Sequence, residues 1–232
     1  MRRVLITGAN RGLGLALVRQ CMERGDLVLA ACRQPEKAVE LNELGAIAGN
    51  QLAILELELS DPDGIAQAGK IAASKTVALD LLINNAGIYA VGENIRTIDL
   101  EKMEHFNRVN ALGAVLLVQA CLDLLKAGEA PVIVNVSSES GSISALDSFR
   151  CYYYFGSKAL MNMYTRLMAF DPQMTGIRVV AMHPGWVRTD MGGSEAALSP
   201  DDSACCILKI AAELNQQNSG KFYTYQGKEL PW

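Results

Sequence analysis

The sequence predicts an α/β fold in which one doubly wound parallel sheet of about seven strands carries helices on both faces. Two patterns support this prediction. Short runs rich in leucine or β-branched residues alternate with longer helical patterns from end to end, which is typical of βαβ units. The first run also leads directly into a glycine-rich turn that opens a helix, the arrangement of a nucleotide-binding βα turn.

The elements follow one another without a break. Strands are expected at Arg3–Thr7, Leu27–Cys32, Gln51–Glu56, Leu79–Asn84, Pro131–Val136, Ile177–Met182 and Lys221–Thr224. Helices are expected at Leu13–Arg24, Glu36–Glu43, Pro62–Ser74, Leu100–Lys126, Tyr154–Asp171 and Pro200–Asn215, with Pro62 and Pro200 at first-turn positions. No repeat, low-complexity segment or linker interrupts the pattern. Residues 1–232 are therefore expected to form a single domain.

Composition narrows the function classes. The 232 residues carry 21 Lys and Arg against 25 Asp and Glu, a net charge of −4 that does not suggest nucleic-acid binding. Six scattered cysteines without metal-ligand spacing are expected to be reduced thiols, the vicinal Cys205 and Cys206 being either small buried hydrophobes or a redox switch. Neither a signal peptide nor an apolar run of about 18 residues is present, which predicts a cytoplasmic chain without membrane contact.

The glycine-rich turn is the first chemical motif. It reads Thr7-Gly8-Ala9-Asn10-Arg11-Gly12-Leu13-Gly14. Glycines there allow a tight turn and a close approach of the backbone to a pyrophosphate, and the helix N-terminus offers free N–H groups. In this position the motif predicts a dinucleotide site and a Rossmann fold.

The end of the second strand bears on the choice of cofactor. A site for NAD usually has an acidic residue there, whereas this chain has Ala31-Cys32-Arg33. Arg33 and Arg11 can pair with a 2′-phosphate, so NADP(H) is predicted over NAD(H). The alternative is that both arginines are merely solvated.

Two further groups lie at strand ends. A buried strand ends in Asn84-Asn85-Ala86-Gly87 at the carboxyl edge of the sheet, where ligands bind in such folds. The alternative is that these four residues only form a turn. Ser137 and Ser138 close a later strand, and Tyr154 and Lys158 share one helix face. A lysine about 4 Å away could lower the pKa of the tyrosine by up to about three units before desolvation opposes it.

Together these segments resemble the short-chain dehydrogenases/reductases over essentially the whole chain. The resemblance rests on Thr7-Gly8, Gly12-Leu13-Gly14, Asn84-Asn85-Ala86-Gly87, Asn110, Ser138, Tyr154-Phe155-Gly156-Ser157-Lys158 and His183-Pro184-Gly185-Trp186-Val187-Arg188-Thr189-Asp190. Within the family, the phrase from Pro184 to Gly193 and the ending at Pro231-Trp232 are similar to the C-factor and sniffer-type carbonyl reductases.

The resemblance implies an NADPH-dependent reductase of ketones or aldehydes with a small-molecule carbonyl substrate. Tyr154 would be the general acid, Ser138 would bind the carbonyl oxygen, Lys158 would lower the tyrosine pKa and hold a ribose, and Asn110 would hold a water. The cofactor residues it implies, together with those argued above, are Gly8, Asn10, Arg11, Gly12, Leu13, Gly14, Arg33, Glu58, Leu59, Asn85, Ala86, Gly87, Tyr154, Lys158, Pro184, Gly185, Val187 and Thr189.

Several alternatives stay open. Glu58 or Asp61 could contact adenine, Asp61 being also a plausible helix cap. Trp186, Met191 and Tyr153 could wall an open pocket under a short lid, or simply pack. His105 and His183 are expected to be structural and no metal is predicted.

The competing functions are a non-catalytic NADP(H)-binding redox sensor or regulatory protein and, less well matched, a sugar-nucleotide epimerase or dehydratase. Relatives pair through the two long helices, so a homodimer or homotetramer is expected. Alternatively, their apolar residues face the core: Val115, Leu116, Met161 and Met163.

Overall fold

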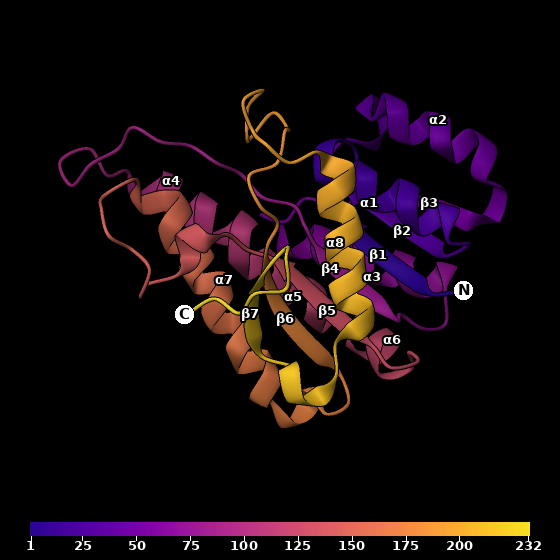
Figure 1. Cartoon of the computed structure of the whole chain (residues 1–232). Coiled ribbons are helices and arrows are strands. Elements are labelled where there is room, and N and C mark those ends of the chain that lie inside the picture. The colour runs from indigo at the N-terminus through magenta and orange to yellow at the C-terminus, as the bar shows by residue number, and fades with distance from the viewer.

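The computed structural model describes residues 1–232 and contains one seven-stranded sheet in which every strand pair is parallel. The strand order is β3-β2-β1-β4-β5-β6-β7. The chain therefore runs outward from β1 in one direction, then returns to add β4 on the other side of β1 (Figure 1). This reversal places the ligand crevice outside the carboxyl ends of β1 and β4.

The bounds of the strands, and of four of the six expected helices, agree closely with those expected from the pattern. The strands are β1 Arg3–Thr7, β2 Leu27–Cys32, β3 Leu52–Glu56, β4 Leu81–Asn84, β5 Val132–Val136, β6 Arg178–His183 and β7 Lys221–Thr224. The helices are α1 Gly12–Glu23, α2 Val39–Ala48, α3 Pro62–Lys75, α4 Leu100–Asn107, α5 Gly113–Ala120, α6 Leu122–Lys126, α7 Tyr152–Phe170 and α8 Pro200–Glu213.

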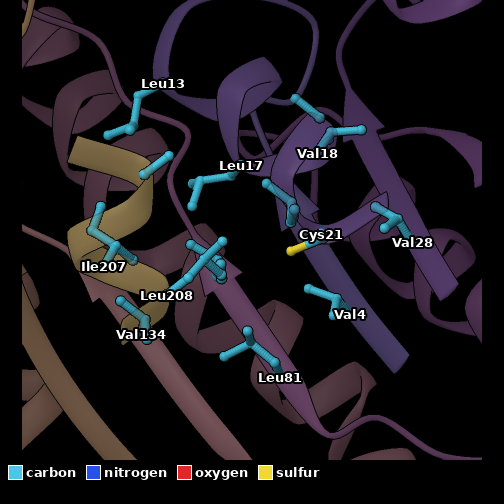
Figure 2. Packing of buried hydrophobic residues seen from close by; sticks show 14 of the residues in the cluster. Val4, Leu13, Leu17, Val18, Cys21, Val28, Leu81, Val134, Ile207 and Leu208 are labelled. Atoms are coloured by element: carbon cyan, nitrogen blue, oxygen red, sulfur yellow. The ribbon is translucent and has the colours of Figure 1, made fainter. Parts of the chain in front are cut away.

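Period-two alternation in the strands feeds two cores. In β1, Val4 and Ile6 join the cluster beneath α1, α2 and α8, whereas Leu5 joins the cluster on the opposite face with α3, α5 and α6. Figure 2 shows the first cluster, in which Leu17 of α1 and Ile207 of α8 pack over the sheet. Burial on both faces explains why these strands are almost continuously apolar.

Two helical predictions need correction. The single helix expected at Leu100–Lys126 is divided by a π-helical turn at Arg108–Leu112 and again at Cys121. The π turn contains Asn110, whose side chain is hydrogen-bonded to the backbone of Ile88, and single π turns of this kind are frequent at functional sites. The helix expected at Glu36–Glu43 is a 3₁₀ turn followed by α2, which begins at Val39.

None of the helices combines the length and the apolar character needed to cross a bilayer.

Candidate active site

The glycine loop between β1 and α1 is built around glycines that no other residue can replace. Gly8 has φ +65°, and a Cβ on Gly14 would lie 2.0 Å from the carbonyl oxygen of Gly8. Arg11, the N-cap of α1, provides no side-chain cap, and the first turn contains no acidic residue. The first N–H groups of α1 therefore remain available to an anion, and Asn10 and Leu13 lie within the same turn.

The β4 end is tied to the glycine loop through Thr7. Its Oγ1 accepts hydrogen bonds of 3.0 Å from the backbone nitrogens of Asn85 and Ala86, and the Asn85 side chain donates to the Thr7 carbonyl at 2.9 Å. A Cβ on Gly8 would lie 2.9 Å from the Cα of Ala86. Thr7, which is fully buried, was not among the predicted site residues, although its position at the end of β1, one residue before Gly8, was a usable signal.

The β6–α8 loop meets the glycine loop from the other side. A Cβ on Gly12 would lie 3.0 Å from the Thr189 side chain. Thr189 Oγ1 in turn accepts from Gly192 and faces the carbonyl of Val187 at 3.4 Å. The predicted residues Pro184, Gly185, Val187 and Thr189 thus belong to a segment that folds back onto the start of α1.

Both predicted 2′-phosphate arginines face carboxylates. Arg11 forms an ion pair with Asp190, and Arg33 Nε lies 3.8 Å from Glu58 Oε2. The end of β2 reads Ala31-Cys32-Arg33 without a carboxylate, but the fold brings Glu58 to Arg33 from the segment that follows β3. All four side chains are at least one-third exposed, so these pairs are weak and exchangeable.

The structure distinguishes the two adenine candidates. Asp61 caps α3, accepting a hydrogen bond from the Asp63 nitrogen. Glu58 accepts from the nitrogen and hydroxyl of Ser60 and is the carboxylate that reaches Arg33. The Leu59 side chain is buried in the core, so it is not available to contact a ligand.

The predicted proton-transfer residues converge at the ends of β5 and α7. The Ser138 hydroxyl accepts from the Ser140 nitrogen at 3.2 Å, and the Ser138–Tyr154 hydrogen bond opposes the rise in the pKa of Tyr154. Lys158 lies beneath, donating at 2.8 Å to the Val136 carbonyl, with its Nζ 5.7 Å from the centre of the Tyr154 ring. A Cβ on Gly87 would lie 3.6 Å from that Nζ.

Desolvation dominates the charges of this pair. Burial raises the pKa of Tyr154 to about 12, despite the opposing hydrogen bond with Ser138. Burial also lowers the pKa of Lys158 to about 8. The pKa of Tyr154 is thus raised and not lowered, because desolvation, which was expected to oppose the lysine, is the largest influence on the phenol.

Asn110 organises the loop after β4. Its Oδ1 accepts from the Ile88 nitrogen at 2.7 Å, and its Nδ2 donates to the Ile88 carbonyl and to Ser157 Oγ. The side chain thereby joins the π turn, the β4–α4 connection and α7. Ser157 lies within the Tyr154–Lys158 motif but is not a predicted site residue, since nothing in the sequence pairs it with Asn110.

Aromatic side chains surround Tyr154 unevenly. Tyr89 lies edge-on to it, with ring centres 5.0 Å apart. Trp186 and Met191 are 59% and 44% exposed and remain available as pocket walls. Tyr153 is not available as a pocket wall, since it is buried and packs against Phe106.

Neither the histidines nor the cysteines form a metal site: no group of three His, Cys, Asp or Glu residues is arranged to hold an ion. His183 is largely buried, which lowers its pKa despite the charge of nearby Glu139. All six cysteines are free thiols, Cys205 exposed and Cys206 partly buried.

Comparisons with known proteins agree with this architecture. A family model described as short chain dehydrogenase matches residues 2–198. The chain is similar to C-signal of Myxococcus xanthus, with 39% identity over 68% of this chain and 95% of that protein. It is also similar to an uncharacterized oxidoreductase of Schizosaccharomyces pombe, with 32% identity over 98% and 96% of the two chains.

Solved structures extend the likeness to the whole chain. The NADPH-bound carbonyl reductase from chicken fatty liver superposes with a TM-score of 0.92 at 36% identity, covering 100% of this chain and 99% of its own. The carbonyl reductase Sniffer of Drosophila melanogaster gives a TM-score of 0.92 at 34% identity, covering 100% of both. The sheet order, the glycine loop and these matches together place the chain in the short-chain dehydrogenase/reductase family of oxidoreductases.

Proposed function

We propose that this chain is an NADPH-dependent reductase that converts a ketone or aldehyde into an alcohol, with Tyr154 as the general acid. The observation that carries the proposal is the convergence of a protonated phenol, a serine hydroxyl and a buried lysine at the carboxyl edge of the sheet. The β4 end that carries Gly87 beside Lys158 also packs against the glycine turn, where a Cβ on Gly8 would meet Ala86.

Tyr154 supplies the proton. With its pKa raised to about 12 by burial, the phenol is protonated at neutral pH and can donate to a carbonyl oxygen as that oxygen gains negative charge. Lys158, charged below about pH 8, then stabilises the resulting phenolate from beneath the ring. A bound nicotinamide would supply the hydride.

Ser138 binds the same oxygen. Its Oγ accepts from the Ser140 nitrogen and its hydroxyl is hydrogen-bonded with Tyr154, so the Ser138 hydrogen would turn to a carbonyl oxygen bound beside the phenol. A donor aimed at the oxygen that becomes charged lowers the transition state more than the ground state. The Asn110 side chain holds the loop after β4 in place at Ile88. We also propose that Asn110 binds a water molecule near Lys158.

The glycine loop and the segments that pack against it, after β4 and after β6, would together bind a dinucleotide. The uncapped start of α1 would bind the pyrophosphate, and Asn85, Ala86 and Gly87 would border the adenine-side ribose, with Glu58 and the Leu59 backbone toward adenine. Val187 and Thr189 would meet the carboxamide, and Pro184 and Gly185 shape that loop. Lys158 would hold the nicotinamide ribose.

NADP(H) is favoured over NAD(H) because Arg11 in the glycine loop and Arg33 at the end of β2 are exposed guanidinium groups that could pair with a 2′-phosphate. The similar chicken and Pseudomonas aeruginosa carbonyl reductases were solved with NADPH and NADP, which supports the same choice here. The phosphate must displace Asp190 and Glu58 from the two guanidinium groups, which weak exposed pairs allow.

The test is oxidation of NADPH, followed at 340 nm, with a panel of ketones, aldehydes and quinones. We expect turnover with NADPH above that with NADH, and a loss of about 10²- to 10⁴-fold in kcat for Tyr154→Phe with NADPH binding retained. Tyr152→Phe, on the same helix but without a lysine four residues on, is the matched control. NADPH binding without reduction of any carbonyl would instead favour the redox-sensor alternative.

We also propose that copies of the chain pair through α5 and α7. Leu167, Phe170 and Met163 of α7 are more than half exposed, and a hollow of about 380 Å³ lies between Val115 and Leu167. Met161, by contrast, faces the core against Ala111 and Ala114. Light scattering should give a dimer or larger species, and Leu167→Lys should reduce it to a monomer; a monomeric wild type contradicts the proposal.

A further inference from the structure

The helix that carries the reacting side chains has no cap of its own. Tyr154 lies in the first turn of α7 and Lys158 in the second. The N-cap residue, Cys151, makes no side-chain hydrogen bond to the helix, and the first turn contains no acidic residue. The leading N–H groups of α7 therefore need an acceptor from elsewhere in the chain.

Glu93, in the β4–α4 connection, provides that acceptor. Its Oε1 accepts from the Tyr152 nitrogen at 2.6 Å and from the Tyr153 nitrogen at 3.0 Å. The residue is only 9% exposed. Burial would raise the pKa of Glu93, but the backbone hydrogen bonds outweigh it and leave the pKa below the usual value. The carboxylate is therefore charged at neutral pH, as the positive end of a helix favours.

A second contact holds the same connection against α7. The Asp99 nitrogen donates to the Tyr153 phenol at 2.7 Å, and the Tyr153 ring packs against Phe106 of α4. Figure 1 shows this connection running out beside α4 and the start of α7. The chain between Ile88 and Asp99 is thus fastened at Ile88 by Asn110, at Glu93 by α7, and at Asp99 by Tyr153.

The fastened segment includes the residue that touches the reacting phenol. Tyr89 follows Ile88 directly and lies edge-on to Tyr154. A change at Glu93 would therefore act on Tyr154 twice, through the first turn of α7 and through the segment that presents Tyr89.

We propose that Glu93 is a positioning residue for the reduction: its side chain caps α7 from a separate connection and sets the place of Tyr154 relative to Ser138 and Tyr89. This inference rests on the proposed function. The property that matters is the reach of the side-chain oxygen to two backbone nitrogens, not the charge it carries, because a neutral amide oxygen accepts the same bonds.

Two conservative variants separate reach from charge. Glu93→Gln keeps the length and an acceptor oxygen but removes the charge, whereas Glu93→Asp keeps the charge and shortens the side chain. We expect Glu93→Gln to retain kcat within about threefold and Glu93→Asp to lose about tenfold or more, since small misplacements of a reacting group are costly. NADPH affinity, measured by quenching of tryptophan fluorescence, should change little in either, because the glycine loop is untouched. The reverse order of kcat would overturn the proposal.

Amide exchange supplies a readout that does not depend on turnover. We expect the Tyr152 and Tyr153 amides to stay protected in Glu93→Gln and to exchange at least about tenfold faster in Glu93→Asp. If the wild type binds NADPH but reduces no carbonyl, the proposed function has failed while this exchange pattern still reports the cap. Unchanged exchange in Glu93→Asp would overturn the cap itself.

A matched control separates positioning from general stability. Asn215 also accepts from two backbone nitrogens, at 2.9 and 3.2 Å, but at a 3₁₀ turn distant in sequence from the reacting residues. Asn215→Ala should lower Tm without lowering kcat. If it lowers kcat as much as Glu93→Asp does at equal loss of Tm, Glu93 is merely structural and the proposal is wrong.

Discussion

The Nζ atom of Lys158 lies 5.7 Å from the centre of the Tyr154 ring, and burial shifts the two groups in opposite directions. The pKa of the lysine falls to about 8 and that of the tyrosine rises to about 12. Both shifts favour the neutral form, because each side chain has lost water without gaining a full opposite charge. At neutral pH the tyrosine is therefore a neutral phenol, while the lysine still carries its charge up to about pH 8.

This burial makes stability depend on pH. Lys158 has a pKa of about 8 in the folded chain against 10.5 as its ordinary value. Between these values the unfolded chain binds more protons, so stability rises with pH. We expect the unfolding free energy of the wild type, relative to Lys158→Met, to increase by roughly 2 kcal/mol from pH 7 to pH 9.5. Urea unfolding at both pH values measures it; a constant difference would mean that Lys158 is not desolvated.

Two glycine variants should behave oppositely. In Gly14→Ala the new Cβ would lie 2.0 Å from the Gly8 carbonyl oxygen, so the glycine loop must move. We expect NADPH binding to be lost and stability to fall by about 1–3 kcal/mol.

Gly156→Ala is the matched control, because its Cβ would meet nothing within 4 Å in α7. There alanine should stabilise the chain by about 0.5–1 kcal/mol through helix propensity. Thermal unfolding and NADPH fluorescence titration distinguish the two, and equal losses in both variants would contradict the close approach at Gly14.

Substitutions in the Arg11–Asp190 ion pair should change the preference between NADPH and NADH. Asp190 is paired with the Arg11 guanidinium, which we propose binds the 2′-phosphate. Asp190→Asn should therefore tighten NADPH binding by about two- to fivefold, the range of an exposed pair, and leave NADH binding unchanged. Arg11→Ala should weaken NADPH selectively. The measurement is dissociation constants for both cofactors at two salt concentrations, and a parallel change for NADPH and NADH would refute the assignment.

The parts of the site that the sequence predicts are those fixed by local geometry. The turn of Gly8, Gly12 and Gly14 needs only a strand before it and a helix after it, and the i, i+4 spacing of Tyr154 and Lys158 needs only a helix. The alternation of Val4, Leu5 and Ile6 likewise follows from the strand period.

The parts that escaped prediction depend on partners distant in sequence. Glu93 meets α7 some sixty residues later, and Glu58 reaches Arg33 only because β3 lies beside β2. The π turn coincides with the hydrogen bonds that Asn110 makes to Ile88, twenty-two residues earlier. The raised pKa of Tyr154 required knowing its burial, which no spacing reveals.

Trp232 links the end of the chain to the loop after Ser138. Its ring stacks on buried Phe222 with centres 5.6 Å apart, and its carbonyl oxygen accepts from the nitrogen and hydroxyl of Ser144. Trp232→Ala should cost about 2 kcal/mol, lowering Tm by about 4–8 °C, because an aromatic contact over the core is lost.

The same variant should raise KM for the carbonyl substrate more than it lowers kcat, since loss of the indole should loosen the loop after Ser138 that Ser144 joins to Trp232, while Tyr154 is untouched. The other tryptophan, Trp186, provides the control for stability. It is 59% exposed, so Trp186→Ala should change stability by no more than about 0.5 kcal/mol. Calorimetry measures Tm for both variants and steady-state kinetics measures KM and kcat for Trp232→Ala; equal Tm values for the two variants would show that the Trp232 contact does not stabilise the chain.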